Sequence, residues 1–334
     1  MPRPRHAIVF LVLLAATSAT HGVPPDTLPT ELPLAVPAGL DSARPVPQNN
    51  PLTDTKIRLG RRLFFDPILS SDGSIACASC HQPAHGFSSP TPLASGVGGK
   101  LGRRNVPSLL NRAYGKTFFW DGREATLEAQ SLRPIESPLE MGNEVAAAVK
   151  RLQAHPAYPA LFQEAFGEPV SASNLAKAIA SFERVLLSGD SRVDRFRLGN
   201  VAALKPAERH GLWLYESSGR CWQCHSGPNF SDEAYHNTGV SWGRGSIDLG
   251  RYEITKRESD RGRFKTPTLR ALTATGPYMH DGSLNTLEEV VEFYNRGGGK
   301  NPHLDPIVQP LGLSKEDVHD LAAFLAALSD TPAK

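Results

Sequence analysis

The stretches that decide the fold are "CASCH", Cys77 to His81, and "CWQCH", Cys221 to His225, which hold all four cysteines of the 334-residue chain. Two disulfides are the ordinary interpretation of four cysteines in an oxidising compartment. A bridge inside either motif would close a very tight loop and would leave the histidine after each second cysteine unexplained. A zinc ribbon needs cysteine pairs about 15–20 residues apart, and a thioredoxin-like site needs only one pair.

C-x-x-C-H is the attachment site of c-type haem. The two thiols add to the vinyl groups of the haem, and the adjacent histidine binds the iron. Because the motif occurs twice, the sequence predicts two covalently bound c-type haems. The residues predicted to hold them are Cys77, Cys80, His81, Cys221, Cys224 and His225.

The first 19 residues have the pattern of a secretory signal, with Arg3 and Arg5, an apolar run over 7–16 and small residues up to Ala19. An uncleaved membrane anchor is the alternative, although this run is too short to span a bilayer. No later stretch is apolar enough to do so. We therefore expect a periplasmic protein without a membrane span in its mature chain. Residues 20–49 are rich in proline and should form an extended arm.

Composition limits the remaining function classes. Lys+Arg 36 against Asp+Glu 34 is close to balance, so no basic excess favours a nucleic-acid partner. The 28 prolines and 29 glycines predict many long loops. The length is sufficient for two domains.

Helical periodicity surrounds both motifs. Apolar spacing predicts helices in "TDTKIRLGRRLFF" (53–65) and "KPAERHGLWLYES" (205–217), directly before each motif. The stretch 171–189 should form a helix that ends at Gly189, and 314–330 one that begins with a capping box from Ser314 to Asp317. The helix expected over 171–189 has an apolar stripe made of Leu175, Ile179, Phe182 and Leu186.

No run of alternating strands is present, so the predicted class is all-α, with two cytochrome c-like haem domains and long loops. The polar stretch 190–200 lacks periodicity, and the domain boundary is expected there. The domains would then be 50–190 and 191–334, with the last helix a candidate to pack on the first domain.

Four longer stretches resemble the bacterial di-haem cytochrome c peroxidase family, and most closely its MauG-like branch. They are "LGRRLFFDPILSSDGSIACASCH", "GRRNVPSLLNRAYGKTFFWDGREATLEAQ", "PIESPLEMG" and "TPTLRALTATGPYMHDGSLNTLEEVV". The resemblance runs from Asn50 to the last helix. It implies that the N-terminal haem reduces hydrogen peroxide. The C-terminal haem would receive electrons from a small cytochrome c or a cupredoxin.

The resemblance also implies roles for single residues. Glu140 matches the catalytic acid/base, Gln130 and Pro134 match residues of the same distal pocket, and Trp120 matches a residue that carries electrons between the haems. If the pocket is apolar, the pKa of Glu140 should be raised. From the residues alone, a surface carboxylate is the favoured interpretation of Glu140. Trp120 is from its residue type a core aromatic, which is compatible with an electron-carrying role.

A calcium site is implied at Asn105, Thr275 and Pro277, through one amide oxygen and two backbone carbonyls. None of the three is a carboxylate, so plain loop residues are the alternative. His280 matches a family position near the C-terminal haem, and an ordinary loop histidine is its alternative.

Two departures bear on the subtype. The loop 86–105 lacks the histidine that in many family members caps the first iron, so this iron should stay open without prior reduction. Tyr294 stands fourteen residues past His280, where the usual ligand is methionine. In MauG-like proteins this position is the axial tyrosine. A core tyrosine is the alternative, and Met279 is the competing ligand.

Three functions follow from these expectations. The chain is a peroxidase supplied by a small redox protein, or a MauG-like oxidase that attacks residues of a partner protein through a bis-ferryl state, or a non-enzymatic di-haem electron carrier. A carrier would have both irons six-coordinate and no need of Glu140.

Overall fold

The computed structural model describes residues 35–242 and 247–329. The signal predicted for 1–19 lies outside the described residues, as does the first part of the arm. Helices dominate, and the sheet among the described residues is one antiparallel pair, β1 (Tyr235–His236) and β2 (Phe264–Lys265). The prediction that helices dominate and that little sheet is present is therefore confirmed. No helix in the described ranges combines the length and apolar character needed to cross a bilayer.

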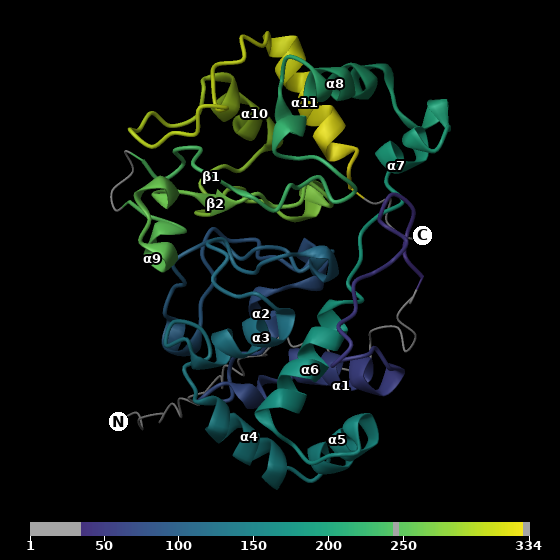
Figure 1. The fold of residues 1–334 in the computed structure, drawn as a ribbon, viewed down its shortest axis with the longest axis vertical. Helices are drawn as coiled ribbons and strands as arrows, with labels where there is room; N and C mark the ends of the chain where they lie inside the picture. The colour runs from purple at the N-terminus through teal and green to yellow at the C-terminus, as the bar shows by residue number, and fades with distance from the viewer. Residues whose placement is uncertain (1–34, 243–246, 330–334) are drawn as a thin grey trace, which may run out of the picture.

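The helices gather in two groups, one below the other (Figure 1). The lower group consists of α1 (Asp54–Phe65), α2 (Cys77–Cys80), α3 (Leu127–Glu136), α4 (Val145–Ala154), α5 (Tyr158–Phe166) and α6 (Ala172–Glu183). The upper group consists of α7 (Arg192–Arg197), α8 (Pro206–Glu216), α9 (Tyr252–Thr255), α10 (Leu287–Asn295) and α11 (Lys315–Ala326). Single 3-10 turns complete the described secondary structure: η1 (Pro67–Leu69), η2 (Pro83–His85), η3 (Val97–Gly99), η4 (Arg112–Tyr114), η5 (Val201–Ala203), η6 (Cys221–Gln223), η7 (Glu258–Asp260) and η8 (Leu272–Ala274).

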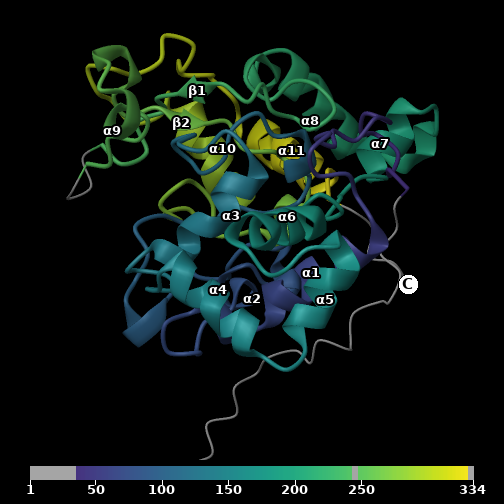
Figure 2. The same ribbon diagram turned by 60° about the horizontal axis from the view of Figure 1, so that its bottom comes forward.

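Each group has its own apolar core. The lower core includes Leu63 and Phe162, and the upper core includes Tyr215 and Phe324, all at most 1% exposed. Long loops from both groups face each other across the middle of the molecule (Figures 1 and 2). The last helix, α11, packs on α8 and α10 of the upper group.

The helices predicted from periodicity are present. The capping box from Ser314 to Asp317 starts α11, with Ser314 Oγ accepting from the Asp317 amide. The four residues of the predicted stripe are all at most 5% exposed, although Leu186 lies beyond the end of α6. Two details were wrong: α6 ends at Glu183 rather than near Gly189, and the stretch 190–200 contains the short helix α7. A second capping box, Ser191 with Asp194, begins α7 where apolar spacing gave no signal.

The two groups repeat the same backbone plan. The bridge Phe118↔Glu124 recurs 160 positions later as Tyr278↔Leu284. The helices α3 and α10 begin at the same offset, each capped by a threonine, Thr126 and Thr286. In the same way α6 crosses α1 and α11 crosses α8. The fold is therefore an internal duplication, which a search for short repeats does not detect.

The described part of the N-terminal arm is tied to both groups. The carbonyl of Ala38 accepts from the Asp190 amide, and the carbonyl of Gly39 accepts from Arg270. The carbonyl of Asp41 accepts from the Tyr114 hydroxyl. The arm is irregular, as its prolines predict, but it lies against the body.

Candidate functional site

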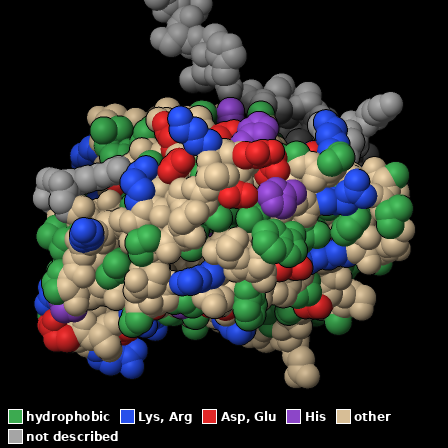
Figure 3. Space-filling model, turned by 90° about the horizontal axis from the view of Figure 1, so that it is seen from above, with side chains coloured by type: hydrophobic (Ala, Val, Ile, Leu, Met, Phe, Trp, Pro, Cys, Tyr) green, Lys and Arg blue, Asp and Glu red, His purple; other side chains and the backbone are tan. Residues whose placement is uncertain are grey.

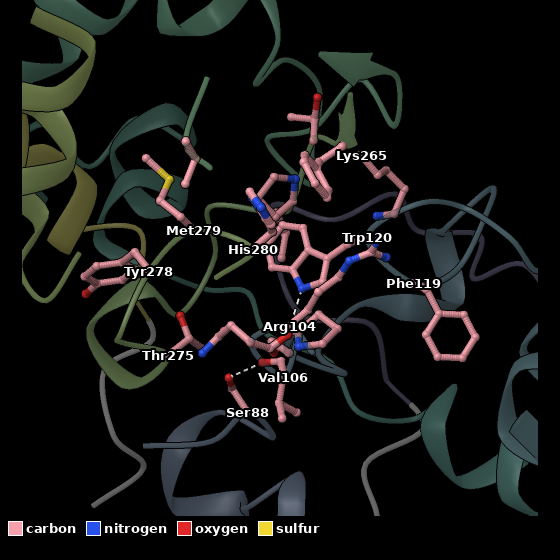
Figure 4. Close-up of a pocket in the computed structure, with 18 of the residues that line it drawn as sticks. Ser88, Arg104, Val106, Phe119, Trp120, Lys265, Thr275, Tyr278, Met279 and His280 are labelled. Atoms are coloured by element: carbon pink, nitrogen blue, oxygen red, sulfur yellow. Dashed lines mark hydrogen bonds between the residues drawn. The ribbon is translucent and has the colours of Figure 1, made fainter. Parts of the chain in front are cut away.

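A cavity of about 630 Å³ lies between the two groups of helices. Its wall brings together nearly all residues singled out in the sequence, from both halves of the chain. Figure 4 shows part of this wall, with Trp120, Thr275 and His280. Of the predicted site residues, those on the wall are Cys80, His81, Asn105, Trp120, Gln130, Glu140, Cys221, Cys224, His225, Thr275, Pro277 and Tyr294, and Pro134, Met279 and His280 join them. Cys77 is set back from this wall and packs against the lower core.

The two motif histidines are held in the same way. His81 Nδ1 lies 2.9 Å from the Phe87 carbonyl oxygen, and His225 Nδ1 lies 3.0 Å from that of Phe230. A carbonyl only accepts, so Nδ1 carries the proton and Nε2 keeps a free lone pair for a metal. Burial lowers the pKa of His81 to about 4 and also lowers that of His225. Both imidazoles are therefore neutral, which is the form that binds iron.

These sites fit a c-type haem. All four cysteines are free thiols, so neither motif forms a disulfide. Burial raises the pKa of Cys80 to about 11, so this thiol is protonated at neutral pH. Each half thus offers two free thiols and a neutral imidazole beside a shared cavity, which is the donor set that haem attachment requires.

Glu140 lies in the loop after α3. Its amide donates to Ser137 O, and its carbonyl accepts from Val97. Gly96 lets the neighbouring loop approach, because a Cβ there would overlap the backbone of Leu139 and Glu140. Burial raises the pKa of Glu140 against the charge of Arg123, so the predicted direction of the shift is confirmed.

Gln130 and Pro134 lie one turn apart on α3 and share the cavity wall with Glu140. Gln130 is 9% exposed, and its Oε1 has no hydrogen-bond partner among the described residues. A buried amide oxygen without a partner is costly. This pocket is therefore built to receive a polar group from the cavity.

Trp120 lies at the centre of the interface. Its indole N–H donates to the Asn105 carbonyl at 2.8 Å, and its ring meets His280 edge-on with centroids 6.4 Å apart. The amide of Lys265 donates to the Trp120 carbonyl, and the amide of Asn105 to the His280 carbonyl. These two bonds are equivalent under the internal duplication, so Trp120 and His280 are counterparts.

The duplication also pairs Pro134 with Tyr294, because α3 and α10 start 160 positions apart. Both residues line the cavity. Burial raises the pKa of the Tyr294 phenol. Met279 lies on the same wall, so the choice between Tyr294 and Met279 as ligand stays a prediction. On the Pro134 side the counterpart position offers no ligand atom at all.

The three predicted calcium residues, Asn105, Thr275 and Pro277, all line the cavity. The amide nitrogen of Asn105 donates to the carbonyls of Pro92 and Thr91, at 3.2 and 3.4 Å, which fixes the side chain. In the described part of the chain, no hydrogen bond uses the Asn105 amide oxygen or the Thr275 and Pro277 carbonyls. The calcium site therefore stays a prediction, with these three oxygens as its expected ligands.

Sequence reasoning missed Lys265, which is 7% exposed on the cavity wall. A lysine in a loop-rich stretch carries no sequence signal of burial. It also missed the duplication, although "DGREATLE" (121–128) and "DGSLNTLE" (281–288) share five of eight positions in the same order.

Comparison with known proteins identifies the family of the chain. The family model for di-haem cytochrome c peroxidase matches residues 54–202. The chain is 42% identical to the methylamine utilization protein MauG of Methylorubrum extorquens over 291 residues, which cover 86% of this chain and 82% of that protein. It is 34% identical to the cytochrome c551 peroxidase of Nitrosomonas europaea, over 88% of this chain and 86% of that one.

Among solved structures, a MauG-like protein associated with microbial copper homeostasis superposes with a TM-score of 0.79 at 33% identity. The match covers 90% of this chain and 95% of that one. Fold, paired motifs and relatives all agree that the chain belongs to the di-haem cytochrome c peroxidase family, a family of haem oxidoreductases that includes MauG.

Proposed function

We propose that this protein is a periplasmic di-haem c-type peroxidase. It reduces hydrogen peroxide to water with electrons from a small redox protein, a cytochrome c or a cupredoxin. Residues 50–190 form the peroxidatic haem domain and 191–334 the electron-transfer domain. The observation that carries the proposal is the asymmetry of the duplicated site. Pro134, which offers no ligand atom, stands beside Glu140 and Gln130, where the other half has Tyr294.

A haem held at His81 would supply the iron that binds peroxide. At this iron the oxygen–oxygen bond would be broken and the two electrons of the donor passed to the oxygen atoms. Glu140 takes the proton from the near peroxide oxygen and returns it to the far one, which leaves as water. Burial raises its pKa, which makes this carboxylate a stronger proton acceptor than an exposed glutamate. The Gln130 carbonyl oxygen, without a partner among the described residues, accepts a hydrogen bond from the bound peroxide.

Two electrons and two protons convert one peroxide into two waters, and a one-electron donor must act twice. Trp120 connects the two halves of the site through its contacts with Asn105 and His280. A small redox protein would meet the second motif, since Trp222 within it is 48% exposed. The face formed by α8, α10 and α11 mixes small apolar groups with charged ones, which suits a transient partner (Figure 3).

A calcium ion at Asn105, Thr275 and Pro277 belongs to the same proposal. The backbone of Asn105 contacts both Trp120 and His280, so a cation there would stiffen the contact between the halves.

Tyr294 supports a second candidate, a MauG-like oxidase of residues in a partner protein. An anionic oxygen ligand favours the oxidised states of iron more than a thioether does. Together with the 42% identity to MauG, this makes storage of oxidising equivalents for a protein substrate the alternative use of the same site. The electron carrier is disfavoured, because Pro134 gives the first iron no sixth ligand.

The test is addition of hydrogen peroxide to the diferric protein, followed optically and by EPR. The unaltered protein should react without prior reduction. Glu140→Gln should keep two covalent haems by mass spectrometry but react about 10²–10⁴-fold more slowly, the usual effect of losing a positioned acid/base. The matched control is Glu136→Gln, which removes an exposed carboxylate at the end of α3.

Equal rates for Glu140→Gln and Glu136→Gln would contradict the role of Glu140. A diferric protein that does not react with peroxide would contradict the open resting state of the first iron, and one that stays unreactive after reduction would contradict the peroxidase itself.

A further inference from the structure

One buried cation on the cavity wall has no role in the site described so far. Lys265 ends β2 and is 7% exposed. In the described part of the chain, its nearest carboxylate oxygen is Glu233 Oε2, at 3.6 Å from Nζ. That is beyond hydrogen-bond length. An ammonium group carries three donors, and burying them without acceptors costs free energy.

Glu233 does not satisfy Lys265, because its carboxylate is already engaged. Arg112 donates to both of its oxygens, at 3.0 and 3.2 Å, and the Lys116 amide donates at 3.2 Å. Two buried cations therefore share one carboxylate. The next acidic group, Asp232, is bound to His236 at 3.0 Å and to the Ala234 amide at 2.8 Å.

The unsatisfied charge faces the cavity beside Trp120 (Figure 4). The amide of Lys265 donates to the Trp120 carbonyl at 2.8 Å, which fixes the lysine backbone at the contact between the halves. Burial lowers the pKa of Lys265 to about 7, with a further contribution from Arg112, against the attraction of Glu233. An anion in the cavity would remove this penalty.

We propose that Lys265 binds a haem propionate carboxylate. The inference rests on the haem content proposed above. Haem is an apolar ring with two carboxylates, and a buried cation with free donors is a strong partner for a carboxylate in such a cavity. Arg104 is already paired with Asp121 and Asp248, and Arg270 with Asp194. Lys265 is the buried cation of this wall whose donors are left over, among the residues that the structure describes.

The contact would have a measurable effect on the haem. A cation at the propionate disfavours the additional positive charge of ferric iron and so raises the midpoint potential. Since Lys265 also holds the Trp120 carbonyl, the same residue joins the edge of the haem to the aromatic side chain between the halves.

The experiment uses the holoprotein with Lys265→Met, which keeps the length of the side chain and removes its charge. The rescue variant is Lys265→Arg. The matched control is Lys300→Met, the same substitution at an exposed position of the same half. The midpoint potential of each haem is measured by optically monitored redox titration, after mass spectrometry confirms two attached haems.

Lys265→Met should lower the potential of one haem, Lys265→Arg should restore most of the shift, and Lys300→Met should leave both potentials in place. The haem that shifts is the one whose propionate Lys265 binds. If both potentials of Lys265→Met equal those of Lys300→Met, the proposal is wrong.

If Lys265→Met does not mature, resonance Raman spectra of the unaltered protein and Lys265→Arg decide instead. A change in the propionate bending band supports the contact, and identical bands refute it. Midpoint potentials and Raman bands are both measured without peroxide. The result for Lys265 therefore does not depend on whether peroxide is the substrate.

Discussion

Tyr294 and Pro134 show how much chemistry one residue can decide. They hold equivalent positions in a duplicated fold, and the rest of their surroundings is built from the same backbone turns. A phenol can bind iron, whereas a pyrrolidine ring cannot. Under the function proposed above, this one difference separates a site that receives peroxide from a site that is closed.

Substituting Tyr294 tests that division. Tyr294→Met should raise the potential of the C-terminal haem, because thioether favours ferrous iron more than an anionic oxygen does. Tyr294→Phe should vacate the position or recruit Met279. Redox titration and the resting optical spectrum are the measurements. A Met–His spectrum in the unaltered protein, or an unchanged spectrum in the Phe variant, would show that Tyr294 is a core residue and not an iron ligand.

Glu183 gives a second prediction at this scale, in pH dependence. Its Oε2 is buried without a partner among the described residues, and burial raises its pKa to about 8 against the charge of Arg184. An unfolded glutamate titrates near pH 4.3. As the pH rises between these values, the unfolded chain releases this proton first, so the wild type loses stability.

Glu183→Gln removes the titration and mimics the neutral acid. The variant should become more stable relative to the wild type as the pH rises from about 5 to about 8. The comparison is of Tm at both pH values, with the exposed Glu136→Gln as control. A difference in Tm that does not change with pH would show that Glu183 is ionised in the folded protein.

At the scale of elements, glycine sets how closely helices cross. Gly60 of α1 lies against the Ala178 carbonyl of α6, and Gly211 of α8 lies against the Asp320 carbonyl of α11. A Cβ at either position would overlap that oxygen. The same close crossing therefore precedes each cysteine motif, and it positions the motif relative to the core.

Gly60→Ala should destabilise the protein by about 1–3 kcal/mol through overpacking, although alanine is the better helix former by about 1 kcal/mol. Chemical denaturation measures the change. Arg58→Ala is the control, since that side chain is 56% exposed on the same helix. A stabilised Gly60→Ala protein would mean that α1 and α6 separate without cost.

At the scale of the whole molecule, Arg270 holds three segments together. Its guanidinium donates to both carboxylate oxygens of Asp194, at 2.7 and 2.9 Å, and to the Gly39 carbonyl at 2.8 Å. Arg270 is 1% exposed and Asp194 3%. The arm, the segment between the helix groups and the upper loops therefore meet at one buried ion pair.

Arg270→Met should cost about 3–5 kcal/mol, because it leaves the Asp194 carboxylate buried and unpaired. Arg195 also lies on α7, and its exposed pair is with Asp190, which precedes this helix. Arg195→Met should therefore cost at most about 1 kcal/mol. Denaturant titration of both variants makes the comparison. Similar small costs would show that solvent reaches Asp194.

The sequence by itself determined the haem attachment, the helices beside each motif and the family, because these depend on local spacing. The motifs Cys77 to His81 and Cys221 to His225 each hold their reactive groups within five residues. An amphipathic helix such as α11 is recognised from the spacing of its own apolar residues. The tertiary structure decided what depends on distant residues meeting. It brought Glu140, Trp120 and Tyr294 to one cavity, ordered α7 through a capping box and Arg270, and buried Lys265 beside an engaged Glu233. Burial and ion pairing are properties of the packed chain, so no local pattern could have predicted them.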